Sequence, residues 1–170
     1  GGRIIDALFQ GLMSYDESGA PVNELAESVT SDDQQTWTIK IKGGTTFTNG
    51  EAVTAKSFVD AWNYGALLSN AQLSSYFFEG IEGYSADADS PLTGLAVVDD
   101  TTFTVKLNQP EADFPLRLGY SAYLPLPSAA YADMAAFGEA PIGNGPYMMN
   151  GAWRHNEAVD LVVNPDYSGP

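Results

Sequence analysis

The sequence predicts a mixed α and β domain, and three segments carry this prediction. Residues 36–42 (TWTIKIK) alternate apolar and polar side chains, as in a strand with one buried face. Residues 94–107 have the composition of two strands joined by a polar turn at residues 99–101. Residues 55–66 repeat apolar side chains at the spacing of an amphipathic helix. Each segment has one apolar face that needs cover, so we expect the three faces to share a core. Its expected members are Trp37, Ile39, Ile41, Phe58, Val59, Trp62, Phe103, Val105 and Leu107.

Turn and cap residues mark the ends of these segments. Asn49–Gly50 is a strong turn signal after the first strand, and Thr54 suits the N-cap of the helix. Upstream, residues 4–13 have apolar side chains at a helical spacing, and Gly11 suits the C-terminal end of that helix. The remaining predictions are a polar turn at 15–21, an aromatic loop at 70–91, a Pro-rich path at 110–127, and strands at 147–150 and 159–163.

The charge balance excludes two classes of partner. Lys and Arg number 7 and Asp and Glu number 22, which gives a formal net charge of −15 over 170 residues. Nucleic acids and anionic membrane surfaces bind clustered Lys and Arg, so we expect neither as a partner. Apolar residues make up 44% of the chain, and 8 Phe, 3 Trp and 9 Tyr supply aromatic content that disordered chains lack. We therefore expect a folded domain with a core.

Residues that catalyse reactions or bind metals are scarce. The chain has no Cys, and the single His155 cannot form a zinc site alone. Phosphate-loop, zinc-protease and serine-hydrolase motifs are absent. The acidic pairs Asp32–Asp33 and Asp99–Asp100 lie in predicted turns, where solvated charge is the ordinary role, and we interpret the loop 87–90 (DADS) in the same way. We predict no catalytic residue, no metal site and no cofactor.

The chain has no apolar run long enough to span a bilayer and no visible signal peptide. Apolar patterns continue from residue 4 to residue 163, so we interpret both ends as cuts within a longer protein.

Aromatic side chains are the chain's main candidates for ligand binding, because ligand sites are mostly apolar and aromatic. Each of them could instead pack in the core. The candidates are Tyr64, Tyr76, Phe77, Phe78, Tyr120 and Tyr123.

Four stretches in series resemble the bacterial extracellular solute-binding proteins of family 5, the oligopeptide- and dipeptide-binding proteins. Residues 25–62 combine an LAES element, a W-x-x-x-[LI]-[RK] strand, an F-x-[DN]-G turn and a [VL]-T-A-x-[DS]-[FV]-V helix start. Residues 6–12 (DALFQGL) are similar to the family's "lfeGL" segment, and residues 99–110 to its D-x-x-T-F-x-V-x-L-x-x-P hairpin. Residues 142–167 are similar to its GTGPY…NPxY segment.

Two residues depart from the family pattern. Ser57 stands where the family usually has an acidic residue, which weakens the expected capping box at the helix start. Ser168 stands where Trp usually follows the Asp–Tyr pair.

The resemblance implies part of the N-terminal lobe of a type II periplasmic-binding-protein-like fold. Residues 1–140 would form the extra subdomain of that lobe and residues 141–170 the first strands of its main part, with the second lobe absent. The implied site residues are Tyr76, Phe77, Asn144 and Tyr147. Of these, Tyr76 or Phe77 is expected to face the cleft, and the turn at residues 143–146 to lie at the passage between subdomains, where glycine lets backbones pass closely.

The implied function is the oligopeptide-binding component of an ABC importer. It would capture extracellular peptides and deliver them to the permease and ATPase subunits, without being an enzyme. The protein would be a monomer outside the cytoplasm, in the periplasm or on the cell surface, either free or lipid-anchored. Within the family, nickel chelates and sugars are other ligands, but residues 144–153 are most similar to the oligopeptide branch.

Two other functional classes stay open on the sequence. A carboxylate-based hydrolase would show a perturbed acidic pair inside a cleft. A surface glycan-binding or adhesion module would show its aromatic side chains in one flat exposed row, whereas aromatic side chains at a cleft edge favour the transporter.

Overall fold

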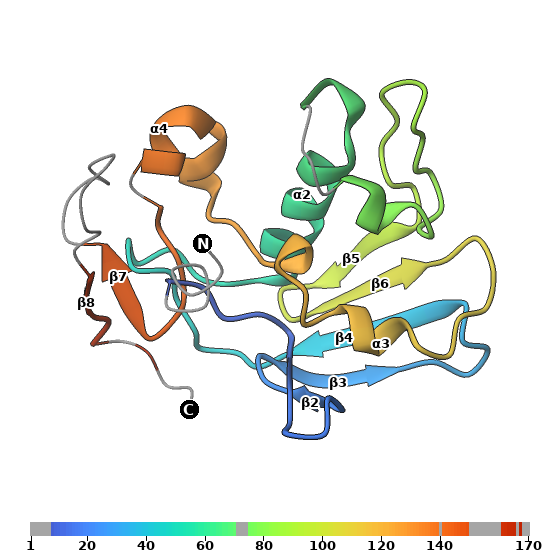
Figure 1. The fold of residues 1–170 in the computed structure, drawn as a ribbon, viewed down its shortest axis with the longest axis horizontal. Coiled ribbons are helices and arrows are strands. Elements are labelled where there is room, and N and C mark those ends of the chain that lie inside the picture. The colour runs from blue at the N-terminus through green and yellow to red at the C-terminus, as the bar shows by residue number, and fades with distance from the viewer. Residues whose placement is uncertain (1–7, 71–74, 140, 150–160, 166, 168–170) are drawn as a thin grey trace. The chain divides into compact units, whose positions relative to one another are not determined.

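The computed structural model describes residues 8–70, 75–139, 141–149, 161–165 and 167, and mixes short helices with antiparallel strands (Figure 1). The chain forms two compact units: a small unit of residues 1–10, 43–53 and 126–170, and a large unit of residues 11–42 and 54–125. The elements of the large unit are β1 (Met13–Tyr15), β2 (Pro21–Asn23), β3 (Ala26–Thr30), β4 (Thr36–Ile41), α2 (Ala55–Ala66), η1 (Leu68–Asn70), η2 (Ser75–Phe78), β5 (Leu95–Asp99), β6 (Thr102–Lys106), α3 (Phe114–Arg117) and η3 (Ser121–Tyr123). Those of the small unit are η4 (Ser128–Tyr131), α4 (Met134–Glu139), β7 (Tyr147–Met149) and β8 (Leu161–Val163).

The large unit is built on a four-stranded antiparallel sheet in the order β3-β4-β6-β5. Along β4 the side chains alternate between exposed and buried, which confirms the strand predicted from its period of two. Trp37 pairs with Val105 of β6 and Ile39 pairs with Phe103, so the apolar faces of the two central strands coincide. The other face of β4 presents Thr and Lys side chains to solvent.

Helix α2 covers the apolar face of this sheet. The ring of Phe58 stacks on Phe103 with centroids 5.8 Å apart, and the ring of Trp62 meets Phe103 edge-on at 5.5 Å. All the residues expected in the shared core are buried. The predicted core is therefore confirmed, and it lies entirely within the large unit.

The start of α2 shows how the chain replaces the acidic residue of the family pattern. The hydroxyl of Ser57 accepts a hydrogen bond from the backbone N–H of Thr54 at 3.0 Å, which is the bond that an acidic side chain would accept in a capping box. The backbone N–H of Ala55 donates to the carbonyl of Asp100 at 2.8 Å, in the turn between β5 and β6. Ser57 therefore makes the capping hydrogen bond that the family's acidic residue would make.

The helix predicted over residues 4–13 is wrong in its C-terminal part. Residues 1–7 lie outside the described residues, Leu8 is helical, and residues 9–12 are not helical, with β1 beginning at Met13. The carbonyl of Leu12 accepts hydrogen bonds from the N–H groups of Glu24 and Ala26, which a continuing helix would forbid. Leu8 and Leu12 are buried in different units, so their spacing does not reflect one helical face.

The small unit contains the Asn49–Gly50 turn and the β7–β8 hairpin. Gly50 has a φ of 89°, which confirms a turn that favours glycine. The carboxylate of Glu51 accepts hydrogen bonds from the backbone N–H of Ser128 at 2.8 Å and from its hydroxyl at 2.6 Å, and so connects this turn to η4. β7 pairs antiparallel with β8, in agreement with the two strands predicted there.

None of the helices in the described part of the chain has both the length and the apolarity needed to cross a membrane. The division of the family's lobe near residue 140 concerns a longer protein and stays a prediction.

Trp62 should stabilise the core through the packing of its ring and not through a hydrogen bond. Its ring is fully buried, but its indole N–H has no hydrogen-bond partner among the described residues. We expect Trp62→Ala to lower the free energy of unfolding by about 3–5 kcal/mol because of the cavity it leaves. Trp62→Phe should cost much less, because it keeps a ring and removes an unpaired donor. Chemical denaturation measures both, and equal losses would contradict this account.

Any side chain at Gly143 should destabilise the fold, because the backbone of Leu8 lies too close to leave room for a Cβ atom. A Cβ atom at this position would lie 1.8 Å from the carbonyl oxygen of Leu8, whereas one at Gly19 would meet nothing within 4 Å and would suffer only from its φ of 85°. We expect Gly143→Ala to cost at least about 1–3 kcal/mol of stability and to lower the melting temperature more than Gly19→Ala. Calorimetric melting of the two variants tests this expectation, and a smaller effect at Gly143 would disprove it.

Candidate ligand-binding site

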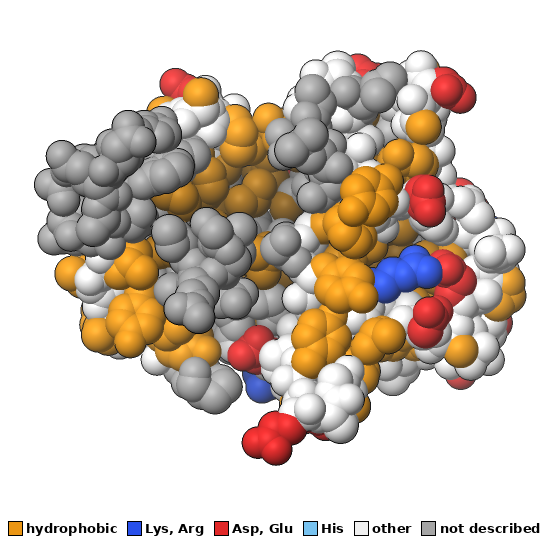
Figure 2. Space-filling model, viewed as in Figure 1, with side chains coloured by type: hydrophobic (Ala, Val, Ile, Leu, Met, Phe, Trp, Pro, Cys, Tyr) orange, Lys and Arg blue, Asp and Glu red, His pale blue; other side chains and the backbone are white. Residues whose placement is uncertain are grey.

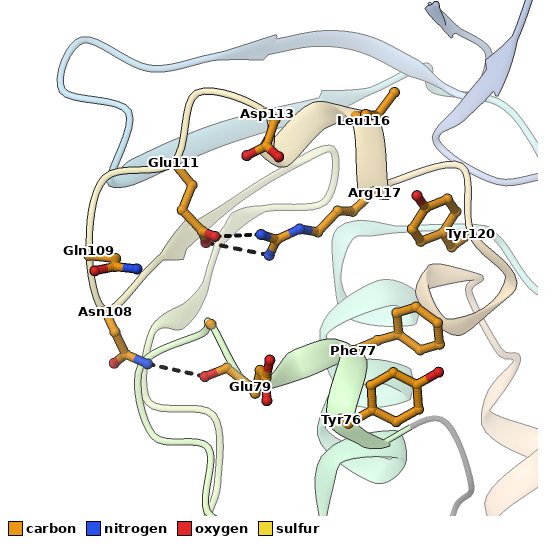
Figure 3. Close-up of a pocket in the computed structure, with 11 residues that line it drawn as sticks. Tyr76, Phe77, Glu79, Asn108, Gln109, Glu111, Asp113, Leu116, Arg117 and Tyr120 are labelled. Carbon is orange, nitrogen blue, oxygen red and sulfur yellow. Dashed lines mark hydrogen bonds and ion pairs between the residues drawn. The ribbon is translucent and has the colours of Figure 1, made fainter. Parts of the chain in front are cut away.

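A pocket of about 500 Å³ opens on the large unit (Figure 3). One wall comes from η2 and the residues that follow it, and the other from the chain between β6 and α3 and from α3 itself. We call it the aromatic pocket. It is lined by Tyr76, Phe77, Glu79, Gly80, Asn108, Gln109, Glu111, Asp113, Leu116, Arg117 and Tyr120.

The orientation of η2 is set by Phe78. Its ring is buried, with centroids 6.3 Å from Trp62 and 5.2 Å from Tyr123. A 3₁₀ helix has three residues per turn, so Tyr76 and Phe77 must point away from the side that Phe78 occupies. Tyr76 is 58% exposed and Phe77 is half-buried, and both face the pocket in Figure 3.

A hydrogen bond from the hydroxyl of Tyr123 connects the η2 wall to the core. The hydroxyl donates to the carbonyl oxygen of Phe77, while the ring of Tyr123 lies in the core. Burial raises the pKa of Tyr123 to about 12, so the phenol stays protonated and remains a donor at neutral pH.

Aromatic rings continue beyond the pocket in a row of four rings joined by three contacts. Tyr76 stacks on Phe77 at 4.5 Å between centroids, Phe77 meets Tyr120 edge-on at 5.7 Å, and Tyr120 lies 6.1 Å from Tyr15. Figure 2 shows hydrophobic side chains gathered in a band on this face, beside a basic side chain with acidic groups around it. We call Tyr15, Tyr120, Phe77 and Tyr76 the aromatic row.

Two contacts fix the outer end of the aromatic row. The hydroxyl of Tyr15 donates to the carbonyl of Leu116 in α3. A Cβ atom at Gly119 would lie 2.6 Å from the Tyr15 ring, so only glycine leaves this ring its place. Burial is the main cause that raises the pKa of Tyr15, followed by the nearby Tyr120.

An ion pair forms the polar floor of the pocket. The guanidinium of Arg117 binds both carboxylate oxygens of Glu111, with Nη1 3.4 Å from Oε2, and the two side chains are only 27% and 18% exposed. Gly80 packs against this pair, since a Cβ atom there would lie 3.0 Å from Oε2 of Glu111. The side-chain amide of Asn108 donates to the carbonyl of Glu79 at 3.2 Å and ties the two walls together.

The remaining charges of the pocket are negative. Glu79 and Asp113 line it and are exposed, and Asp113 acts on the guanidinium of Arg117 through its charge. Glu111 and Arg117 neutralise each other. The pocket therefore offers aromatic faces, amide groups and the exposed carboxylates of Glu79 and Asp113.

Two of the four predicted site residues line the aromatic pocket, and the other two lie in the small unit. Tyr76 and Phe77 lie side by side in the aromatic pocket, and are not buried in the core. Asn144 is buried in the small unit, where its amide oxygen accepts from the N–H of Gln10 at 2.8 Å and its amide nitrogen donates to the carbonyl of Gln10 at 3.0 Å. Tyr147 is 43% exposed in β7. A ligand role for Asn144 would compete with both of its present bonds, and the roles of all four stay predictions.

The acidic pairs in turns stabilise those turns. A carboxylate oxygen of Asp33 accepts hydrogen bonds from the N–H groups of Thr36 and Gln35, and these bonds lower its pKa. The N–H of Thr101 does the same for Asp99. Asp89, in the loop 87–90, accepts a hydrogen bond from the N–H of Ser69 at 2.7 Å. The described residues contain no cluster of His, Cys, Asp and Glu suited to a metal ion, and His155 lies outside them.

The family model that describes the middle part of the bacterial extracellular solute-binding proteins, family 5, matches residues 20–170. The oligopeptide-binding protein OppA of Bacillus subtilis is 30% identical, in an alignment of 98% of this chain with 32% of OppA. The periplasmic oligopeptide-binding protein OppA of Escherichia coli is 32% identical over 94% of this chain and 31% of its own length. The chain thus spans about a third of the length of these curated relatives.

Solved structures of solute-binding proteins have the same fold as this chain. The murein tripeptide binding protein MppA of Escherichia coli superposes with a TM-score of 0.89 and 26% identity, over 96% of this chain and 34% of that protein. The chain has the fold of the matching part of a type II periplasmic-binding-protein-like structure, as the sequence predicted. With its family model matched from residue 20 to residue 170, the chain belongs to the bacterial extracellular solute-binding proteins of family 5.

Proposed function

We propose that this chain is part of the peptide-capturing lobe of an extracytoplasmic oligopeptide-binding protein that serves an ABC importer. The observation that supports this most is the alignment of almost the whole chain with two proteins named as oligopeptide-binding, at 30% and 32% identity. The whole protein would pass its peptide to permease and ATPase subunits in the membrane. It would act as a monomer, with no catalytic step.

The pocket offers the chemistry that such a role needs. Ligand sites combine apolar and aromatic walls with a few placed polar groups. Here Tyr76, Phe77 and Tyr120 supply the wall, while Asn108 and Gln109 supply amide groups. Aromatic faces accept many side chains with modest selectivity, as a general peptide carrier requires.

The hydrolase alternative finds less support. An acid catalyst needs a carboxyl group whose pKa is raised. The carboxylates of Asp33 and Asp99 have lowered pKa values instead, and Glu111 is neutralised by Arg117.

The glycan-binding alternative is supported by one observation, because the aromatic row is partly exposed. Three of its four rings line a pocket, however, and this agrees better with a ligand that enters a cavity.

Peptide affinity should require more than this chain. A clamp gains affinity by enclosing its ligand and excluding water from the hydrogen bonds it makes. A single lobe leaves an extended peptide half solvated, and its bonds then compete with water. We expect the 170-residue chain to bind peptides more weakly than about 1 μM, which corresponds to about −8 kcal/mol. The longer protein that contains it should bind them more tightly than that.

Calorimetry with a mixed peptide library at physiological salt tests both expectations. Micromolar binding by the 170-residue chain would show that this part carries the site alone, and the clamp account would be wrong. A longer protein that ignores peptides but binds oligosaccharides would instead favour the glycan-binding alternative.

A further inference from the structure

We propose that the aromatic pocket holds the basic side chain of an extended peptide, a lysine or an arginine, and so selects peptides by charge. This inference rests on the proposed function, because it names the part of a peptide that the pocket would take.

The uncompensated charge of the pocket is negative. Glu79 and Asp113 stand on opposite walls, one after η2 and the other just before α3, and with Glu111 they set three carboxylates against the single guanidinium of Arg117. A cation between them gains attraction from both, whereas an acidic side chain is repelled. The formal charge of −15 on the chain adds to this preference at long range.

Arg117 does not reverse this preference. Its guanidinium is bound at two points by Glu111, and both side chains are partly buried. Gly80 closes the pair from one side, since a Cβ atom at Gly80 would already lie 3.4 Å from Nη1 of Arg117. An anionic ligand would have to displace Glu111 from a partly buried ion pair, and leaving that carboxylate without its partner costs free energy.

The rings suit the rest of a basic side chain. Lysine and arginine have apolar stems that pack on aromatic surface, with a charged end that reaches polar groups. Their cationic ends are also attracted to the faces of Tyr and Phe rings. Tyr76, Phe77 and Tyr120 lie on one side of the pocket and the acidic groups beyond them, as Figure 3 shows. A stem lying on the rings would therefore direct its charge towards Glu79 or Asp113.

The test uses the full-length protein that contains this chain and a series of alanine pentapeptides. Each peptide carries one lysine or one norleucine, and every position is sampled, because norleucine keeps the stem without the charge. At one position at least, calorimetry should show the lysine peptide binding about tenfold more tightly. In the variant E79Q/D113N this ratio should fall to about twofold or less.

A matched control separates local charge from overall charge. D32N/D87N removes two exposed carboxylates that do not line the pocket, so it should keep the tenfold ratio. The single variants E79Q and D113N preserve the test if the pair fails to fold. A lysine preference that survives in E79Q/D113N, or equal binding of lysine and norleucine peptides to the unmodified protein, would overturn this inference alone. Failure of every peptide to bind would contradict the proposed function itself.

Discussion

The buried ring of Trp62 is the contact on which the rest of the large unit depends. It meets Phe103 of the sheet at 5.5 Å, Tyr123 of η3 at 5.2 Å and Phe78 of η2 at 6.3 Å. A sheet, a helix and two short 3₁₀ turns therefore share one aromatic cluster. Because the turns have few backbone hydrogen bonds of their own, the cluster fixes their positions, and with them the residues that they present to solvent.

The same cluster determines the geometry of the pocket. Phe78 points inward to join it, and this orientation leaves Tyr76 and Phe77 on the outer side. Tyr123 belongs to the core through its ring and to the pocket wall through the bond from its hydroxyl to Phe77. On the opposite wall the hydroxyl of Tyr15 holds the carbonyl of Leu116. Walls fixed before a ligand arrives lose less conformational entropy when it binds, which favours affinity.

The sequence predicts best where the signal is local and periodic. The alternation of β4 and the spacing along α2 come from the burial of one face, and both elements form as expected. Leu8 and Leu12 also show a helical spacing, but each is buried against a different part of the chain, so the period misleads there. Helix α4 was missed, although Asp133 gave a signal: its carboxylate accepts from the N–H of Ala136, as an N-cap does.

The candidate site could be predicted only in part. Clustered aromatic residues pointed to Tyr76 and Phe77, and Tyr120 was among the other candidates. The pair of Glu111 and Arg117 could not be found, because residues six apart are not neighbours on a helix and only the turn before α3 brings them together. Asn144 stands in a conspicuous Gly-rich turn, but its amide bonds to Gln10, 134 residues away, and no local pattern reveals such a contact.

The aromatic core around Trp62, and not the η2 loop itself, fixes the pocket wall. Native-state hydrogen exchange measures this directly, because the N–H groups of Glu79 and Ile81 close the turns of η2, at 3.2 and 3.0 Å from the carbonyls of Tyr76 and Phe78. We expect these two amides to open with the same free energy as the amides of β4 and β6 in the core. Exchange through a local opening of much lower free energy, while the sheet stays protected, would show instead that the wall moves independently of the core.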